Sequence, residues 1–138
     1  MGGYTIPAKK EIYNGVNYDS QLEAKMAKIL TTNGIEFIPH VWIEVEIDGA
    51  KVFRGADFFM PRAILPYFVN SFINVIEVKG CLTMEDYKRL HAMKQEGISC
   101  FIALPQLIEF WEVPGQFIKH KMGKIKKRRT KNDTDIDF

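Results

Sequence analysis

The chain has 138 residues, and 46% of them are hydrophobic, which suits a single globular domain with a packed core. No apolar run approaches the roughly 20 residues that a membrane helix needs, and the first ten residues, MGGYTIPAKK, lack the apolar stretch of a signal peptide. We therefore expect a cytoplasmic protein with no membrane partner. Residues 119–138 hold eight basic and three acidic residues (+5), whereas the rest holds 11 basic and 14 acidic ones (−3), a distribution common in proteins that meet nucleic acid.

The first elements are predicted from turn and cap residues. Residues 1–10 are polar and Gly-rich, which predicts a poorly ordered arm. Asn14-Gly15 tolerates the positive φ of a type I′ turn and predicts a tight turn. Ser20 followed by Glu23 forms a capping box, which predicts a helix that begins there and ends at Asn33-Gly34.

Three strands are expected next. Residues 37–47 alternate apolar and polar side chains, which indicates a half-buried strand. Asp48-Gly49 turns the chain into a second strand over residues 52–60. Residues 61–72 contain two prolines and predict a loop, and residues 73–79 predict a third strand.

The second half predicts a helix followed by a fourth strand. Thr83 with Asp86 caps a helix that runs to about Glu96, residues 98–104 predict a strand, and residues 107–113 fit a strand or a short helix. The first three strands have short connections and should run antiparallel, whereas the helix before the fourth allows a parallel crossover. We therefore expect an α/β (α+β) fold of order αβββαβ, with a mixed sheet of four or five strands flanked by helices.

Polar residues on two of these strands carry the candidate chemistry. Asp57 lies near the end of the second strand, and Glu77 and Lys79 lie two residues apart on the third, so they leave the same face. Because these strands are antiparallel, we expect a bend or bulge to carry Asp57 toward Glu77. Two carboxylates, with the Val78 carbonyl as a further ligand, suit Mg²⁺, and a lysine beside the metal suits phosphodiester hydrolysis.

These residues resemble the PD-(D/E)XK nuclease superfamily, through Asp57 with Glu77-Val78-Lys79 and a helical glutamate, Glu23. The likeness covers about Asp19 to Trp111, and within the superfamily it is nearest to phage endonuclease I-type Holliday junction resolvases. The resemblance implies a restriction-endonuclease-like core, and it implies one or two Mg²⁺ or Mn²⁺ ions held by Asp57, Glu77, Val78 and Glu23. Ala56 departs from the pattern, because that superfamily usually has proline before the aspartate.

Several side chains have a structural interpretation beside the functional one. Glu23 is either the fourth member of the capping box or a metal ligand. The tryptophans, Trp42 and Trp111, are interpreted as packing residues, and the three scattered histidines, His40, His91 and His120, as structural. Lys88 and Arg89 are interpreted as solvated, with Lys88 a candidate phosphate contact; the other candidate DNA contacts are Arg54, Arg62, Lys124, Lys126, Lys127, Arg128 and Arg129.

The resulting functional hypothesis is a metal-dependent DNA endonuclease over residues 1–118, followed by a flexible basic and then acidic tail over 119–138. Branched DNA such as a four-way junction is the substrate that we expect first, and its cleavage needs two active sites and hence a homodimer. The apolar loop 61–72 could pack on the partner subunit. The alternatives are a duplex or nicking endonuclease, or a non-catalytic nucleic-acid-binding module. The tail ends in Asp133-Thr134-Asp135-Ile136-Asp137-Phe138, like the acidic tails of single-stranded-DNA-binding proteins, and could recruit a replication or recombination partner.

Overall fold

The structure, a computed structural model, describes residues 10–122. The predictions made for residues 1–9, for the acidic end 133–138 and for five of the candidate DNA contacts fall outside the described residues. Those five contacts are Lys124, Lys126, Lys127, Arg128 and Arg129.

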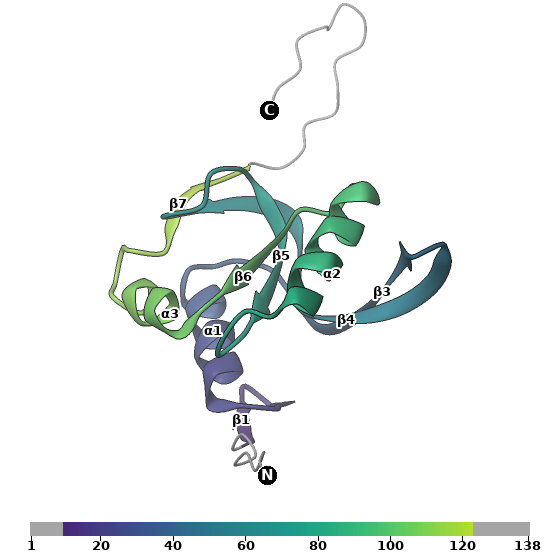
Figure 1. Ribbon diagram of the computed structural model, residues 1–138. Helices are drawn as coiled ribbons and strands as arrows, with labels where there is room; N and C mark the ends of the chain where they lie inside the picture. The colour runs from purple at the N-terminus through teal and green to yellow at the C-terminus, as the bar shows by residue number, and fades with distance from the viewer. Residues whose placement is uncertain (1–9, 123–138) are drawn as a thin grey trace, which may run out of the picture.

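Within residues 10–122 the chain forms seven strands and three helices, which Figure 1 shows in space. The elements are β1 (Glu11–Tyr13), β2 (Val16–Tyr18), α1 (Gln21–Thr32), β3 (Ile38–Ile47), β4 (Ala50–Pro66), β5 (Ile73–Val78), α2 (Met84–Gln95), β6 (Cys100–Ala103), α3 (Pro105–Trp111) and β7 (Ile118–Lys121). The predicted order of helix, three strands, helix and strand is confirmed between α1 and β6, with a hairpin before it and α3 and β7 after it.

The main sheet is mixed and has five strands. Its order is β3-β4-β5-β6, and β7 also pairs with β4, whereas β1 and β2 form a separate hairpin. The pairs β3–β4 and β4–β5 are antiparallel, and β5–β6 is parallel across α2, as expected from the lengths of their connections. The predicted hairpin turns are confirmed, with positive φ at Asn14 and Asp48 and at the glycine that follows each.

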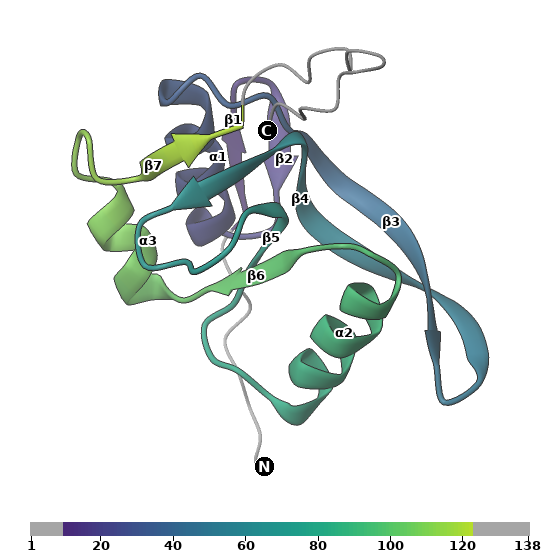
Figure 2. The ribbon, with the colours of Figure 1, turned by 90° about the horizontal axis from the view of Figure 1, so that it is seen from above.

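Both faces of the sheet are covered by helices, and each face has its own apolar cluster. The larger cluster joins α1 and α3 to β4 and β5, with Met26, Phe58 and Trp111 among its buried members. The smaller one joins Val45 of β3 to Ala92 and Met93 of α2. Figure 2 shows α1 and α2 on opposite sides of the strands. The fold is therefore a three-layer α+β arrangement, in which the central strands β4 and β5 run between the two helical layers.

The predicted loop over residues 61–72 is wrong in its first half, because β4 continues to Pro66. Pro61 fits within this strand because it lies where the register with β5 shifts, between Phe59 and Ile64, so no ladder hydrogen bond needs its missing N–H. Ile64 and Val69 are buried in the larger cluster. Burial within the chain accounts for these two side chains, whereas Phe68 of the same segment is 69% exposed.

The C-terminal boundary predicted at residue 118 also needs correction. Ile118, His120 and Lys121 pair with the end of β4, so the folded part extends at least through β7. The segment left open as strand or short helix is the helix α3, with Pro105 in its first turn. None of the helices described in residues 10–122 is both long and apolar enough to cross a membrane.

The distal half of the β3–β4 hairpin projects beyond the rest of the sheet in both views (Figures 1 and 2). β3 is the edge strand here, and it pairs with β4 through residues 38–59 of the hairpin. The point where this arm leaves the body of the sheet is where the candidate site lies.

Candidate active site

A cleft of about 420 Å³ opens at the base of the projecting hairpin. It is bounded by the start of α1, by β3, β4 and the end of β5, and by one residue of α2, Arg89. The predicted residues Glu23, Asp57, Glu77, Val78 and Lys79 all line it; its other lining residues are Asp19, His40, Val41, Trp42, Gly55, Ala56 and Arg89. Residues that are far apart in the sequence, from Asp19 to Arg89, therefore share one space.

Asp57 and Glu77 meet through the register of β4 and β5. Phe58 pairs with Ile76, so the next step of this antiparallel register sets Asp57 opposite Glu77. The expected bend or bulge is therefore unnecessary, since cross-strand partners already share a face. Each carboxylate accepts a backbone N–H of the other strand: Asp57 N–H donates to Glu77 Oε2 at 3.0 Å, and Val78 N–H donates to Asp57 Oδ2 at 2.7 Å.

Burial raises the pKa of both carboxylates. Glu77 is 3% exposed, and desolvation, followed by the negative charge of Asp57, raises its pKa to about 7, although Arg89 and Lys79 oppose the shift. Desolvation also raises the pKa of Asp57, against the Val78 N–H, Lys79 and Arg89. A cation bound between two such buried carboxylates would stabilise their ionised forms.

The positive charges of the cleft are organised by Asp86, in the first turn of α2. Asp86 is 4% exposed and completes a capping box with Thr83, whose N–H and hydroxyl donate to Asp86 Oδ2 at 2.9 and 3.0 Å. Its other oxygen, Oδ1, lies 3.1 Å from Arg89 Nη2 and 3.5 Å from Lys79 Nζ. Arg89 Nη2 in turn lies 3.6 Å from Glu77 Oε1. One buried carboxylate thus holds two cations beside Glu77.

The pKa of Asp86 lies below its ordinary value of 3.8 despite its burial. Desolvation raises it, but the hydrogen bonds from Thr83 and the charges of Lys79 and Arg89 together outweigh that effect. The helix cap, which was predicted from Thr83 and Asp86, therefore also serves the site, a second role that no local pattern indicates. The interpretation of Arg89 as a solvated residue is wrong, because its side chain is only 17% exposed.

Glu23 enters the cleft from the first turn of α1. The Ser20 hydroxyl accepts the Glu23 N–H at 3.1 Å, which is the expected cap bond. The Glu23 side chain, however, faces His40, with Oε1 3.7 Å from Nε2. Oε1 is buried and has no hydrogen-bond partner among the described residues. Desolvation, followed by the charges of Asp57 and Asp19, raises the pKa of Glu23.

His40 is a candidate functional residue that the sequence interpretation missed. It lies opposite Asp57 in the β3–β4 register and has a positive φ of 58°. Single ligand atoms of Asp19, Glu23 and His40 lie within 4.8 Å of one another. The alternating pattern of β3 indicates that His40 shares a strand face with Trp42 and Glu44, but only the register shows that this face meets Asp57.

The donor groups of the cleft fit a divalent metal ion. Asp57 and Glu77 each keep one oxygen that accepts no backbone N–H, and carboxylate oxygens are ligands of Mg²⁺ and Mn²⁺. The buried Oε1 of Glu23, which accepts no hydrogen bond from the described residues, adds a further oxygen that could bind a metal. The imidazole of His40 would favour a transition metal over Mg²⁺ at the outer position near Glu23.

The remaining predicted residues lie outside the cleft or at its rim. Lys88 is on α2 and pairs only loosely with Glu85, 4.0 Å away. Arg54 and Arg62 are on β4 but do not line the cleft, and Arg54 Nη1 donates to the Phe53 carbonyl at 3.2 Å. The packing interpretation is confirmed for Trp111, which is 1% exposed, and is wrong for Trp42, which is 71% exposed.

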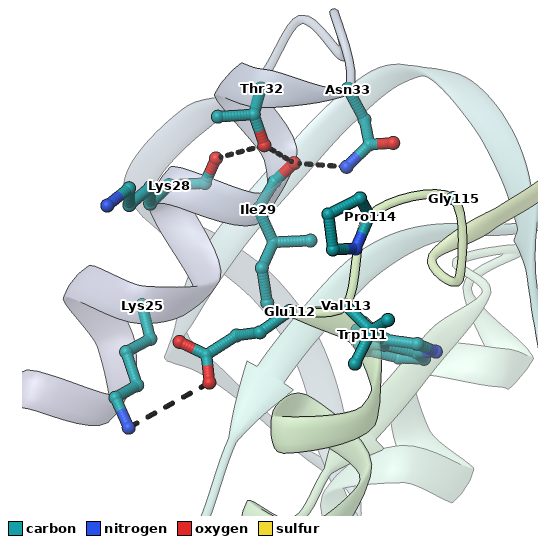
Figure 3. Close-up of a pocket in the computed structure, with 10 residues that line it drawn as sticks. All are labelled: Lys25, Lys28, Ile29, Thr32, Asn33, Trp111, Glu112, Val113, Pro114 and Gly115. Carbon is teal, nitrogen blue, oxygen red and sulfur yellow. Dashed lines mark hydrogen bonds and ion pairs between the residues drawn. The ribbon is translucent and has the colours of Figure 1, made fainter.

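A second cavity, of about 390 Å³, lies on another part of the surface between α1 and the segment after α3 (Figure 3). Several of its polar groups are already partnered: Lys25 pairs with Glu112 at 4.0 Å, and the side chains of Thr32 and Asn33 donate to the Ile29 carbonyl. None of the predicted site residues lines this cavity.

No protein-family model, curated protein or solved structure matches the chain.

Proposed function

We propose that this protein is a divalent-metal-dependent DNA endonuclease whose core is of the restriction-endonuclease type, as its resemblance to the PD-(D/E)XK superfamily implies. One observation carries the proposal. Glu23 lies in the first turn of α1, Asp57 lies on β4, and Glu77 and Lys79 lie at the end of β5 and directly after it. All four side chains nevertheless line a single cleft. Two largely buried carboxylates, a third carboxylate and a lysine around one open cleft are the groups that metal-dependent hydrolysis of a phosphodiester requires.

Asp57 and Glu77, with the Val78 carbonyl, would hold Mg²⁺ or Mn²⁺, and Glu23 would serve the same ion or a second one. When bound, such an ion polarises the phosphate and lowers the pKa of a bound water. The backbone N–H groups of Asp57 and Val78 orient the two carboxylates before any ligand arrives. Orientation by hydrogen bonds to neighbouring groups is what keeps metal ligands in place.

Lys79 and Arg89 would stabilise the negative charge that develops on the phosphate. Both cations are held at the cleft by Asp86, which leaves each of them with further N–H groups to donate. Donors fixed in advance at the place where charge develops contribute more than donors that must reorganise.

Branched DNA, and a four-way junction in particular, is the substrate that we propose first. Two cuts on opposite strands require two active sites and hence a homodimer, which light scattering at micromolar concentration would detect. A monomer that cuts nicked or continuous duplex DNA would favour the simpler endonuclease.

The test is incubation of the full chain with matched linear, nicked, flapped and four-way DNA, in Mg²⁺ or in chelator. We expect the wild type to cleave DNA in Mg²⁺ and not in chelator. Glu77→Gln and Lys79→Ala should abolish this cleavage, while both variants should still bind DNA in chelator. Binding without cleavage of any substrate, in Mg²⁺ and in Mn²⁺, would leave a non-catalytic nucleic-acid-binding module. A wild-type rate in Glu77→Gln would show that the metal site is assigned wrongly.

A further inference from the structure

The indole ring of Trp42 lies on the wall of the cleft yet is largely open to solvent. Its cross-strand partner on β4 is Gly55. A Cβ at Gly55 would lie 3.7 to 3.9 Å from three adjacent ring carbons of Trp42. Nearly equal distances to three neighbouring carbons mean that the glycine lies under the face of the ring and not at its edge. One face of the indole therefore rests on bare backbone, and 71% of the residue remains exposed.

A second exposed ring extends this surface along the hairpin. Phe53 is 61% exposed, and it pairs with Glu44, one step of the same strand face away from the pair of Trp42 and Gly55. Neither Trp42 nor Phe53 takes part in any of the aromatic pairs formed within residues 10–122. Two largely exposed aromatic side chains thus lie on one face of the hairpin, and the first of them, Trp42, lines the cleft.

The chemistry beside this ring indicates what it binds. Lys79 and Arg89 line the same cleft as Trp42, so a flat apolar surface and two cations face one ligand space. A nucleotide matches both features, because its base stacks on an aromatic face while its phosphate contacts cations. An apolar peptide or a second copy of the chain would use the ring but would leave the cations and buried carboxylates without a ligand.

We infer that Trp42 stacks on an unpaired nucleobase next to the phosphate that the cleft holds. This inference rests on the proposed function and specifies its substrate class. In continuous duplex DNA both faces of every base are stacked on neighbours, so none is free for a side chain. The favoured substrate is therefore DNA with unpaired or unstacked bases at the cut, such as a single strand, a flap or the branch point of a junction.

Tryptophan fluorescence tests this inference without any catalysis. The chain has two tryptophans, and the second, Trp111, is buried, so quenching by a ligand reports on Trp42. In chelator, a mixed-sequence single-stranded oligonucleotide should quench the emission saturably, and the same sequence as a duplex should quench it far less. Trp42→Ala should weaken single-strand binding at least about fivefold, whereas Trp42→Phe should keep most of it. Phe68→Ala, which removes a comparably exposed ring outside the cleft, should change nothing.

An abasic substitution makes the assignment specific to stacking. A set of oligonucleotides with one abasic nucleotide at successive positions should include one that binds the wild type as weakly as Trp42→Ala binds the unmodified strand. That oligonucleotide should lose no further affinity with the variant, because the ring and the base belong to one interaction. Independent, additive losses would overturn the inference.

The outcomes separate this inference from the proposed function. Quenching by single strands with no cleavage in Mg²⁺ would leave the base-binding site and reject the nuclease. Cleavage of flapped and single-stranded DNA at equal rates by the wild type and Trp42→Ala would keep the nuclease and reject the base-binding site. If Trp42→Ala instead changes the sedimentation of the protein alone and not its affinity for DNA, the ring belongs to an interface between copies of the chain and the inference is wrong.

Discussion

Glu77 combines deep burial, a neighbouring carboxylate and a pKa raised to about 7. In the unfolded chain its pKa would be close to 4.5, so between these two values the folded protein binds more protons than the unfolded one. The free energy of unfolding of the metal-free protein should therefore fall as the pH rises through this window. A shift of this size corresponds to about 3 kcal/mol for Glu77, and Asp57 adds to it in the same direction.

Urea unfolding in chelator at pH 5, 6.5 and 8 measures this dependence. Wild-type protein should lose stability from pH 5 to pH 8, and Glu77→Gln should lose clearly less. Mg²⁺ should restore stability at pH 8 in the wild type, because a cation that binds only the folded state stabilises it. A wild-type stability that is flat or rising across this range would contradict the raised pKa.

Arg89 is the second residue at which a single change should be decisive. Arg89→Ala removes one of the two cations near Glu77 and leaves Asp86 and Glu77 buried with less compensation. We expect cleavage to fall about tenfold to a hundredfold, with partial recovery in Arg89→Lys. Lys88→Ala, one position away on the same helix but outside the cleft, is the matched control and should stay within about twofold of the wild type. Equal losses in Lys88→Ala and Arg89→Ala would mean that α2 contributes only diffuse positive charge.

At the scale of the element, the start of α1 allows the two interpretations of Glu23, as a helix cap and as a metal ligand, to be tested separately. The Ser20 hydroxyl caps the helix, whereas the Glu23 side chain faces His40 in the cleft. Ser20→Ala should therefore cost about 1 kcal/mol of stability with little loss of cleavage. Glu23→Gln should leave the melting temperature nearly unchanged and remove most of the cleavage. If Glu23→Gln melts early and cuts normally, the residue is only a cap.

Local elements were predictable because their determinants are contiguous. Asn14-Gly15 and Asp48-Gly49 each define a turn within two residues, and Thr83 with Asp86 defines a helix start within four. The length of β4 was not predictable, since Pro61 ends a strand only where the neighbouring strand needs its N–H. That condition depends on the register with β5, which no local pattern in the sequence contains.

The same distinction applies to the candidate site. Asp57, Glu77 and Lys79 could be found from strand periodicity and residue chemistry, and they do share a cleft. His40 and Arg89 were missed because each becomes part of that cleft only through long-range packing. His40 depends on its register opposite Asp57, and Arg89 depends on its ion pair with Glu77 of β5. A residue that acts through tertiary neighbours leaves no signature at its own position.

At the scale of the whole molecule, the basic C-terminal region begins before the folded part ends. Residues 119–138 carry a net charge of +5 beside a body of −3, and this asymmetry placed the domain boundary at 118. Ile118–Lys121 nevertheless form β7, and His120 packs its ring edge-on against Phe72. Composition therefore marked the start of the basic region, whereas strand pairing marks how far the folded part reaches.

Two truncations test that division. A chain ending at Met122 keeps every element of the main sheet, so its unfolding midpoint should match that of the full chain. A chain ending at Ile118 removes most of the pairing of β7 with β4 and the packing of His120 on Phe72, and it should be less stable by on the order of 2 kcal/mol. Equal stabilities for the two truncated chains would show that β7 contributes nothing to the fold.

The chain that ends at Met122 also tests whether residues 123–138 bind DNA, through the dependence of DNA affinity on salt concentration. Removing residues 123–138 takes away six basic residues, among them Lys126, Arg128 and Arg129. If these bind phosphates, the slope of log affinity against log salt should become shallower on duplex DNA by about 0.9 for each phosphate that the truncated chain no longer neutralises. Cleavage at saturating DNA should be unchanged, because Asp57, Glu77 and Lys79 lie within the remaining domain. A full chain and a chain ending at Met122 with the same slope would show that residues 123–138 do not bind DNA phosphates.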